Sequence, residues 1–148
     1  MYRKILLCYD GTAEGRRALR QGADVAMCMK SHAYLLAISR SMLSSAVPEG
    51  VTPALVDAED ATANQLLTEG VQWLRERAVQ ADGQLVYGNP MVIIPEVAKR
   101  IDADLIVVGY RYKNRLTRWW AEGEEATLLT RVSCSILVCM DHAAPSGA

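Results

Sequence analysis

The sequence predicts one α/β domain in which a five-stranded parallel sheet is covered by helices on both faces. Five short apolar runs recur along the chain, and most intervals between them have the spacing of amphipathic helices. The runs are apolar at odd and even positions alike, as expected for strands that are buried on both faces. Strands that alternate with helices favour a parallel sheet with right-handed crossovers.

The five predicted strands are residues 5–9, 34–38, 84–87, 105–108 and 136–140. Three helical segments between them repeat apolar or small residues at the spacing of one helix face. These residues are Ala18, Leu19, Gly22 and Ala26, then Leu67, Val71, Leu74 and Ala78, then Ile94, Val97, Ala98 and Ile101. Pro95 is predicted in the first turn of the third helix, where its missing N–H is tolerated. A short fourth helix is predicted for residues 124–132, whose acidic beginning suits a helix N-terminus.

The chain has 148 residues, the length of one domain, and we expect a single domain over residues 1–140. Residues 41–60 contain serines, prolines and a glycine, and they predict a long, variable surface loop. Residues 141–148 are small and polar and predict a flexible tail.

The composition excludes several classes of protein. The hydrophobic share of 51% is ordinary for a globular chain, and a net charge of −1 gives no overall field that attracts nucleic acid or an anionic membrane. No apolar run approaches the ~20 residues that span a bilayer, and the N-terminal run is too short for a signal peptide. Four cysteines lie in apolar stretches without C-x-x-C spacing, so we expect buried, reduced thiols and a cytoplasmic protein. They are Cys8, Cys28, Cys134 and Cys139.

Three blocks, in order and at the right spacing, resemble the universal stress protein family over nearly the whole chain. The first is residues 4–12, in which an apolar run ends in Asp10-Gly11-Thr12. The second runs from Gly88-Asn89-Pro90 through Ala103-Asp104 to Gly109, and the third is residues 134–138. The resemblance implies a three-layer fold with strand order 3-2-1-4-5. It also implies a ligand beyond the carboxyl ends of the strands, beside the first strand.

The ligand implied by the family is an adenine nucleotide, ATP or AMP. The candidate nucleotide-binding residues are Asp10, Gly11, Thr12, Ile38, Val108, Gly109, Arg111 and Gly123. Asp10 matches the family position that contacts adenine or ribose. An aspartate there serves equally well as a turn residue that accepts bonds from local N–H groups, and both interpretations stay open. Thr12 is predicted to cap the first helix rather than to contact a ligand.

The family's phosphate-binding pattern is only partly present. In ATP-binding members of the family, the chain after the fourth strand has the pattern glycine, two residues, glycine, nine residues, glycine and a hydroxyl residue. The glycines let the backbone approach the phosphates closely. Gly109 matches the first glycine, but Tyr112 and Glu122 stand at the other two, and Gly123 replaces the hydroxyl residue. Shifting the pattern by one residue recovers Gly123 as a glycine but leaves three carboxylates near the phosphates. We therefore expect weak or lost ATP binding and assign no cofactor firmly.

The carboxylates and the basic segment before them have other interpretations. Glu122, Glu124 and Glu125 are expected to stabilise their own helix N-terminus, with a metal or a basic partner as the alternative. The segment from Tyr110 to Trp120 interleaves arginines and a lysine with aromatic residues, a pattern that can bind single-stranded nucleic acid. The neighbouring acids partly neutralise this segment and argue against nucleic acid as its partner. A solvated loop is favoured, with a protein partner anchored on a tryptophan as the alternative.

The sequence gives little support for catalysis. It lacks a G-x-S-x-G elbow and a phosphate-binding P-loop. His32 is predicted at the wrong end of the sheet and His142 in the tail, with neither held by a carboxylate.

The last strand is expected at an edge of the sheet, and it is apolar throughout. Ile136, Val138 and Met140 are therefore predicted to pair with the same strand of a second copy. The sequence thus predicts a homodimeric regulatory or binding module that is not an enzyme. The alternative is a sensor of ATP or AMP in which Arg111 or Lys113 replaces the lost backbone contacts to phosphate.

Overall fold

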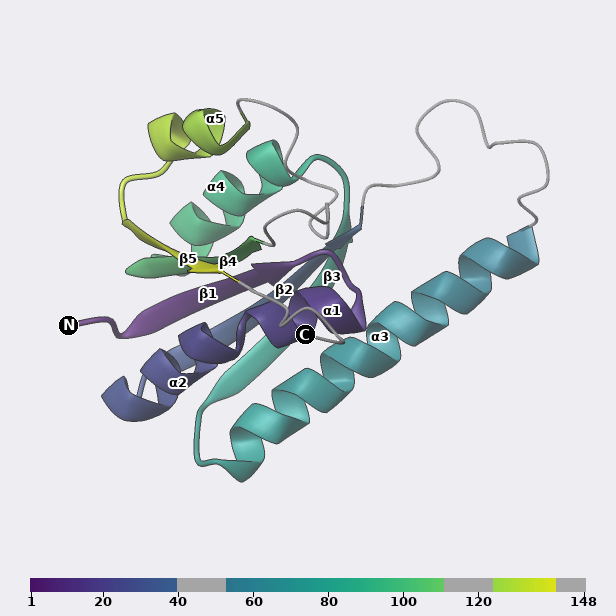
Figure 1. The fold of residues 1–148 in the computed structure, drawn as a ribbon, viewed down its shortest axis with the longest axis horizontal. Coiled ribbons are helices and arrows are strands. Elements are labelled where there is room, and N and C mark those ends of the chain that lie inside the picture. The colour runs from purple at the N-terminus through teal and green to yellow at the C-terminus, as the bar shows by residue number, and fades with distance from the viewer. Residues whose placement is uncertain (40–52, 111–123, 141–148) are drawn as a thin grey trace, which may run out of the picture.

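The computed structural model describes residues 1–39, 53–110 and 124–140. Within these ranges the chain forms one five-stranded parallel sheet of order β3-β2-β1-β4-β5 (Figure 1). The strands are β1 (Lys4–Tyr9), β2 (His32–Ser39), β3 (Ala81–Tyr87), β4 (Leu105–Tyr110) and β5 (Ser135–Met140). The predicted fold class and strand order are confirmed, and each predicted strand lies within an observed one.

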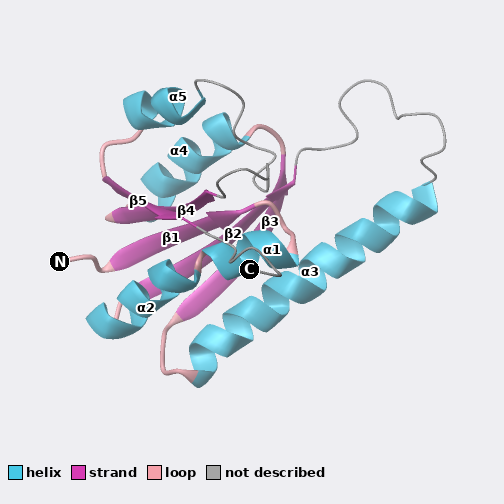
Figure 2. Ribbon diagram, viewed as in Figure 1, coloured by secondary structure: helices cyan, strands magenta, loops and turns pink. Residues whose placement is uncertain are grey.

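The helices cover both faces of the sheet. They are α1 (Ala13–Ala18), α2 (Arg20–Met29), α3 (Pro53–Glu76), α4 (Pro90–Ile101) and α5 (Glu124–Arg131). Figure 2 shows three layers, with α1, α2 and α3 on one face of the sheet and α4 and α5 on the other. The chain moves across the sheet in one direction from β1 to β3 and in the other from β3 to β5. Right-handed crossovers therefore place the two sets of helices on opposite faces.

The core is densest at the central strand. Residues 5–9 of β1 are fully buried, because β1 lies between two strands and beneath helices on both faces. The outer strands are more exposed, and the middle of β3 carries the polar residues Asp82 and Gln84. Of the two edge strands, β3 is therefore mixed in polarity, whereas β5 is apolar from Ile136 to Met140 like the interior strands.

The first helical segment is two helices rather than the single helix predicted. The chain leaves helical geometry at Leu19, which ends α1 and begins α2. The predicted inward face is retained, because Leu19, Gly22 and Ala26 are all buried. At Gly22 a side chain would place its Cβ only 2.5 Å from Cγ1 of Val107. The absence of a side chain lets α2 rest directly on β4.

The predicted loop over residues 41–60 is wrong in its last part. Helix α3 begins at Pro53, a residue whose fixed φ and missing N–H suit a helix start, so residues 53–60 are helical. Residues 41–52 lie outside the described ranges, as does the predicted tail 141–148. The inward face of α3 contains Leu67, Val71 and Leu74 as predicted, but Ala78 is exposed. Ala78 follows the end of the helix with φ 62°, and the chain buries Val79 instead.

The third predicted helix also starts earlier than expected. Helix α4 begins at Pro90, and the Asn89 side chain caps it by accepting a hydrogen bond from the Met91 N–H at 3.0 Å. Pro95 consequently lies inside the helix rather than in its first turn. A proline there cannot donate to the carbonyl four residues earlier, which belongs to Met91. Nη1 of Arg131 donates to that carbonyl at 3.2 Å, so α5 is joined to α4 at the acceptor that Pro95 leaves free.

We expect Arg131→Ala to lower the free energy of unfolding by about 1 kcal/mol, because a charged donor leaves a buried carbonyl. Urea unfolding followed by circular dichroism measures the loss. In a Pro95→Ala background the loss should shrink, since an alanine N–H at position 95 can bond the Met91 carbonyl itself. Lys99→Ala, an exposed change on the same helix, serves as the control. Equal losses from Arg131→Ala in both backgrounds would contradict this account.

Asp104 joins three strands at the amino edge of the sheet. Its Oδ2 accepts hydrogen bonds from the backbone N–H groups of Arg3 at 2.8 Å and Lys4 at 2.9 Å. Its own N–H donates to the Lys4 carbonyl, and its carbonyl accepts from the N–H of Ser135 at the start of β5. The bonds from Lys4 and Arg3 lower the pKa of Asp104. Its stabilising contribution is therefore present at neutral pH and is lost as the pH falls through that lowered pKa.

Candidate functional site

The candidate site lies at the carboxyl edge of the sheet, where β1 is flanked by β2 and β4. In the strand register Cys8 is opposite Val108, and Tyr9 is opposite Ala37. At these positions or just beyond them lie the residues that the sequence analysis assigned to the site: Asp10, Gly11, Thr12, Ile38, Val108 and Gly109. The structure therefore brings these six residues to one edge. Helix α1, which follows β1, and helix α5, the next described helix after β4, lie on opposite faces of the sheet, as expected beside a topological switch point.

Asp10 and Thr12 form a closed local turn. Oδ1 of Asp10 accepts from the Thr12 N–H at 3.0 Å and from the Thr12 hydroxyl at 2.5 Å. The same hydroxyl oxygen accepts from the Gly15 N–H at 3.0 Å, so the predicted helix cap at Thr12 is confirmed. Gly11 between them has φ +84°, a conformation that favours glycine. Asp10 thus acts as a turn residue, while its contact with a ligand stays a prediction.

Two further glycines hold α1 against this edge. At Gly15 a Cβ would overlap Oδ1 of Asp10 and would lie 3.2 Å from the Thr12 hydroxyl oxygen. At Gly109 a Cβ would lie 2.6 Å from the Cβ of Ala18 at the end of α1. Gly109 matches the first glycine of the phosphate-binding pattern, yet it is also required for the contact between β4 and α1.

Gly109→Ala is expected to cost about 2 kcal/mol of unfolding free energy, because the new methyl group overlaps Ala18. Ala18→Gly alone should cost about 1 kcal/mol through helix propensity. In the Gly109→Ala protein, however, Ala18→Gly should raise stability, since it removes the overlapping atom. Chemical denaturation of the four proteins measures this coupling. If the double variant loses the sum of the two single losses in unfolding free energy, the contact between positions 18 and 109 does not limit stability.

Tyr9, the last residue of β1, is a polar residue of this region that the sequence analysis treated only as apolar. Its side chain is 1% exposed, and its hydroxyl has no hydrogen-bond partner among the described residues. Burial raises the pKa of Tyr9 to about 12, although the charge of Arg16 opposes the rise. The hydroxyl therefore keeps its proton and offers a buried donor one residue before Asp10. Only the tertiary structure reveals it, because an apolar run cannot show that a hydroxyl is enclosed.

The remaining predicted pocket residues cannot be placed. Arg111 and Gly123 lie outside the described ranges, together with Tyr112, Glu122 and nearly all of the basic and aromatic segment from Tyr110 to Trp120. Helix α5 begins at Glu124, in agreement with the predicted helix start. The described ranges contain no cluster of histidine, cysteine or acidic side chains suited to a metal ion.

The expectation of four buried thiols holds for only part of the set. Cys8 and Cys139 are buried, Cys134 is half-buried, and Cys28 on α2 is exposed. All four are free. Burial raises the pKa of the Cys8 and Cys139 thiols, which keeps both in the neutral form.

His32 lies at the amino edge of the sheet, as predicted, but it is held by a carboxylate, contrary to the prediction. Its Nε2 is 2.7 Å from Oδ2 of Asp82, and its ring stacks on Tyr34 with the centroids 4.2 Å apart. Nη2 of Arg75 lies 3.6 Å from the other oxygen of Asp82. The predicted third strand began at residue 84, so the sequence analysis did not place Asp82 beside His32. This cluster links β2 to β3 at the end of the sheet away from the candidate site.

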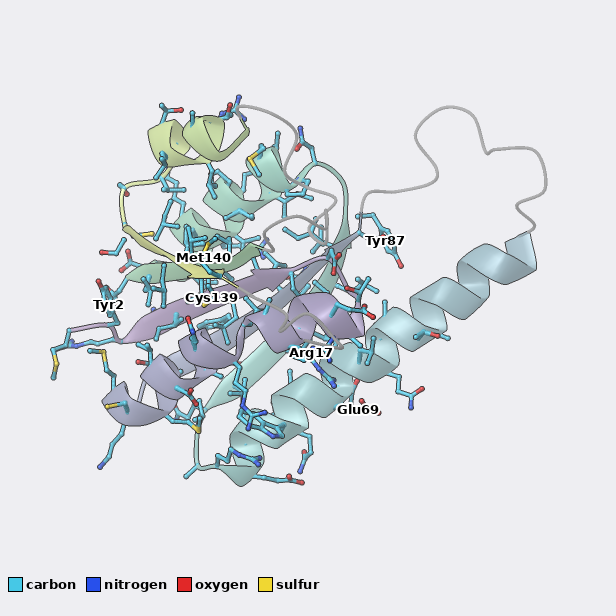
Figure 3. All side chains as sticks on the ribbon, viewed as in Figure 1. Tyr2, Arg17, Glu69, Tyr87, Cys139 and Met140 are labelled. Atoms are coloured by element: carbon cyan, nitrogen blue, oxygen red, sulfur yellow. The ribbon has the colours of Figure 1, made fainter. Side chains whose placement is uncertain are left out.

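Strand β5 forms one edge of the described sheet and pairs there only with β4. Ile136, Val138 and Met140 alternate along it and therefore share one face. Val138 is 44% exposed and Met140 38%, whereas Ile136 is half-buried. Figure 3 shows Met140 on this outer strand.

With the fold and this edge established, comparison with known proteins gives the family. The model of the universal stress protein family matches residues 1–140, and the chain belongs to this family. The described helices include none long and apolar enough to cross a membrane.

Three relatives illustrate the similarity. The stress response protein NhaX of Bacillus subtilis (strain 168) is 26% identical, and the match covers 78% of this chain and 84% of that protein. The universal stress protein UspA of Lactobacillus plantarum has a similar structure, with a TM-score of 0.72, 22% identity and coverage of 93% of this chain and 97% of that one. A universal stress protein family member of Arabidopsis thaliana, solved with AMP bound, has a TM-score of 0.66 and 17% identity, with 95% of this chain and 93% of that chain covered.

Proposed function

We propose that this chain is a homodimeric, cytoplasmic binding and regulatory module of the stress response, without catalytic activity and with weak affinity for ATP. The observation that carries the proposal is the replacement of two glycines of the phosphate-binding pattern by Tyr112 and Glu122. Bulky side chains prevent the backbone from approaching a phosphate, and the added carboxylate repels it.

The residues that do match the pattern have roles that need no nucleotide. Asp10 accepts two hydrogen bonds from Thr12, and Gly109 makes room for Ala18. Their presence is therefore explained by the turn and by the packing of α1. The Thr12 hydroxyl donates to the Asp10 carboxylate at this edge, but the same hydroxyl oxygen caps α1 by accepting from the Gly15 N–H, so the pair is explained by the turn.

The second candidate is a sensor of AMP. The Arabidopsis relative carries AMP, and a monophosphate needs less of the glycine loop than ATP does. In this chain Asp10 would contact the ribose or the base, and Arg111 or Lys113 would supply the charge that holds the phosphate. AMP and ATP would both bind at this same edge of the sheet.

Calorimetric titration with ATP and with AMP, each with and without magnesium, tests the proposal. We expect ATP to bind more weakly than the micromolar range in both conditions, because the backbone contacts to phosphate are lost. Binding of AMP alone would support the second candidate. Micromolar binding of ATP would overturn the leading proposal and identify a rebuilt phosphate site.

Two substitutions at Asp10 separate a ligand contact from the local turn. Asp10→Asn keeps an oxygen that can accept from Thr12, whereas Asp10→Ala removes it. If a nucleotide uses the carboxylate, both variants lose affinity while only Asp10→Ala loses stability. If both variants bind as the unmodified protein does, Asp10 has a structural role only.

The homodimer is proposed to form through the outer edge of β5. Its backbone groups face outward beside the exposed side chains of Val138 and Met140, and such an edge is stabilised by pairing with another strand. Two-fold pairing of β5 with its copy would continue the sheet across both subunits.

Val138→Lys is expected to convert the dimer to a monomer, because two lysines would meet across the symmetric strand pair. Sedimentation velocity over a concentration series measures the change. The matched control is Leu129→Lys on α5, where an even more exposed leucine (64%) lies away from the strand edge. A protein that is monomeric without any substitution, or a Val138→Lys protein that stays dimeric, would rule out this interface.

A further inference from the structure

The last strand carries two neighbouring sulfur side chains in opposite environments. Successive residues of a strand point to opposite faces of the sheet, so Cys139 and Met140 of β5 face different surroundings. Cys139 is 1% exposed and faces α2, where the backbone of Gly22 hydrogen-bonds to its sulfur. Met140 is 38% exposed and lies on the face that it shares with Val138. The thioether of Met140 is therefore open to reagents at the outer edge of the sheet.

A methionine thioether reacts with peroxides without first losing a proton. The sulfur lone pair attacks one peroxide oxygen, an S–O bond forms and the O–O bond breaks, and the other oxygen leaves as water after proton transfer. The sulfur is oxidised by two electrons to the sulfoxide, and the peroxide is reduced. Solvent exposure then decides which methionine reacts. Of the described methionines, Met91 is buried, whereas Met29 and Met140 are exposed.

In the proposed homodimer, Met140 lies within the strand pair. This inference rests on that interface, in which β5 pairs with its copy about a two-fold axis beside Val138. The same symmetry places Met140 of one subunit opposite Ile136 of the second copy, at both ends of the pair. Ile136 is half-buried and apolar, so the thioether exchanges water for an apolar neighbour when the dimer forms.

From this placement we propose that Met140 is a redox switch of dimerisation, at which oxidation to the sulfoxide by a peroxide separates the subunits. The sulfoxide oxygen is a polar acceptor, and opposite an isoleucine it loses its water without gaining a donor. Two-fold symmetry repeats this cost at both ends of the strand pair. A thiol-dependent sulfoxide reductase restores the thioether, so the switch is reversible. It needs no nucleotide at the carboxyl edge.

Met29 provides a matched comparison within the same chain. Its side chain is 37% exposed, nearly the same fraction as that of Met140. Met29 ends α2 just before β2, at the amino edge of the sheet, whereas Met140 ends β5 at the carboxyl edge. In a free subunit the two thioethers should react at similar rates. In the dimer only Met140 is covered, so oxidation enters through dissociated subunits and then keeps them apart.

Hydrogen peroxide is the probe, and peptide mass spectrometry measures the oxidation rate of each methionine in the full chain. A Cys28→Ser background removes the exposed thiol. At about pH 6 thiolates are scarce, while thioethers still react. We expect Met29 to react at a constant rate and Met140 to react more slowly as the protein concentration rises through the dimer dissociation constant. Equal rates at every concentration, in a protein that sediments as a dimer, would show that Met140 stays uncovered and would overturn the switch.

Sedimentation velocity before and after peroxide treatment measures the switch itself. We expect oxidation to raise the dimer dissociation constant by about tenfold or more, while the circular dichroism of the folded subunits is unchanged. Met140→Leu cannot form a sulfoxide, so its sedimentation should be the same before and after treatment. Met29→Leu should respond to peroxide as the parent protein does. Treatment of the oxidised protein with a sulfoxide reductase and a thiol should restore the dimer.

Failure of the switch and failure of the interface give different results. A protein that is monomeric before peroxide is added contradicts the proposed β5 interface, and the switch falls with it. A dimer that persists after mass spectrometry shows complete oxidation of Met140 refutes the switch and leaves the interface standing. Equal dissociation of the Met140→Leu dimer by peroxide has the same meaning, because the responsible oxidation then lies elsewhere.

Discussion

The close seating of α1 and α2 on the centre of the sheet is the constraint on which the rest of the structure depends. It is possible because glycine occupies the contact points: Gly109 lies under Ala18, and Gly22 lies against Val107 and Leu7. With the helices at this depth, Gly15 comes against Asp10, and the cap at Thr12 closes. Side chains cannot interdigitate where the backbones touch. The close packing there therefore depends on glycines, which have no side chain.

This constraint changes how the phosphate-binding pattern is interpreted. A glycine at the end of β4 is usually taken as room for a ligand, yet here the room is filled by α1. Asp10 likewise directs one oxygen to its own turn. Asp10 and Gly109 therefore have structural roles that explain their presence whether or not a nucleotide binds.

The two faces of the sheet are stabilised in different ways. On one face, glycines bring α2 and α3 close to the strands. On the other, Pro95 removes a bond inside α4, and Arg131 of α5 supplies a donor to the Met91 carbonyl. This bond joins α5 to α4. Asp104 then links β1, β4 and β5 at the opposite edge.

The sequence by itself determined the family, the strand order, the cap at Thr12 and the gathering of Asp10, Ile38 and Gly109 at one edge. The family and the strand order came from the resemblance carried by the three sequence blocks, whereas the cap and the shared edge follow from local patterns and from the rule that parallel strands end together. Tertiary structure alone decided the break at Leu19, the pairing of His32 with Asp82, the enclosure of the Tyr9 hydroxyl and the position of Arg20 over the Trp73 ring. The last three depend on atoms from segments far apart in the chain. Spacing within one segment cannot specify which side chains from another will fill, or fail to fill, the space beside it.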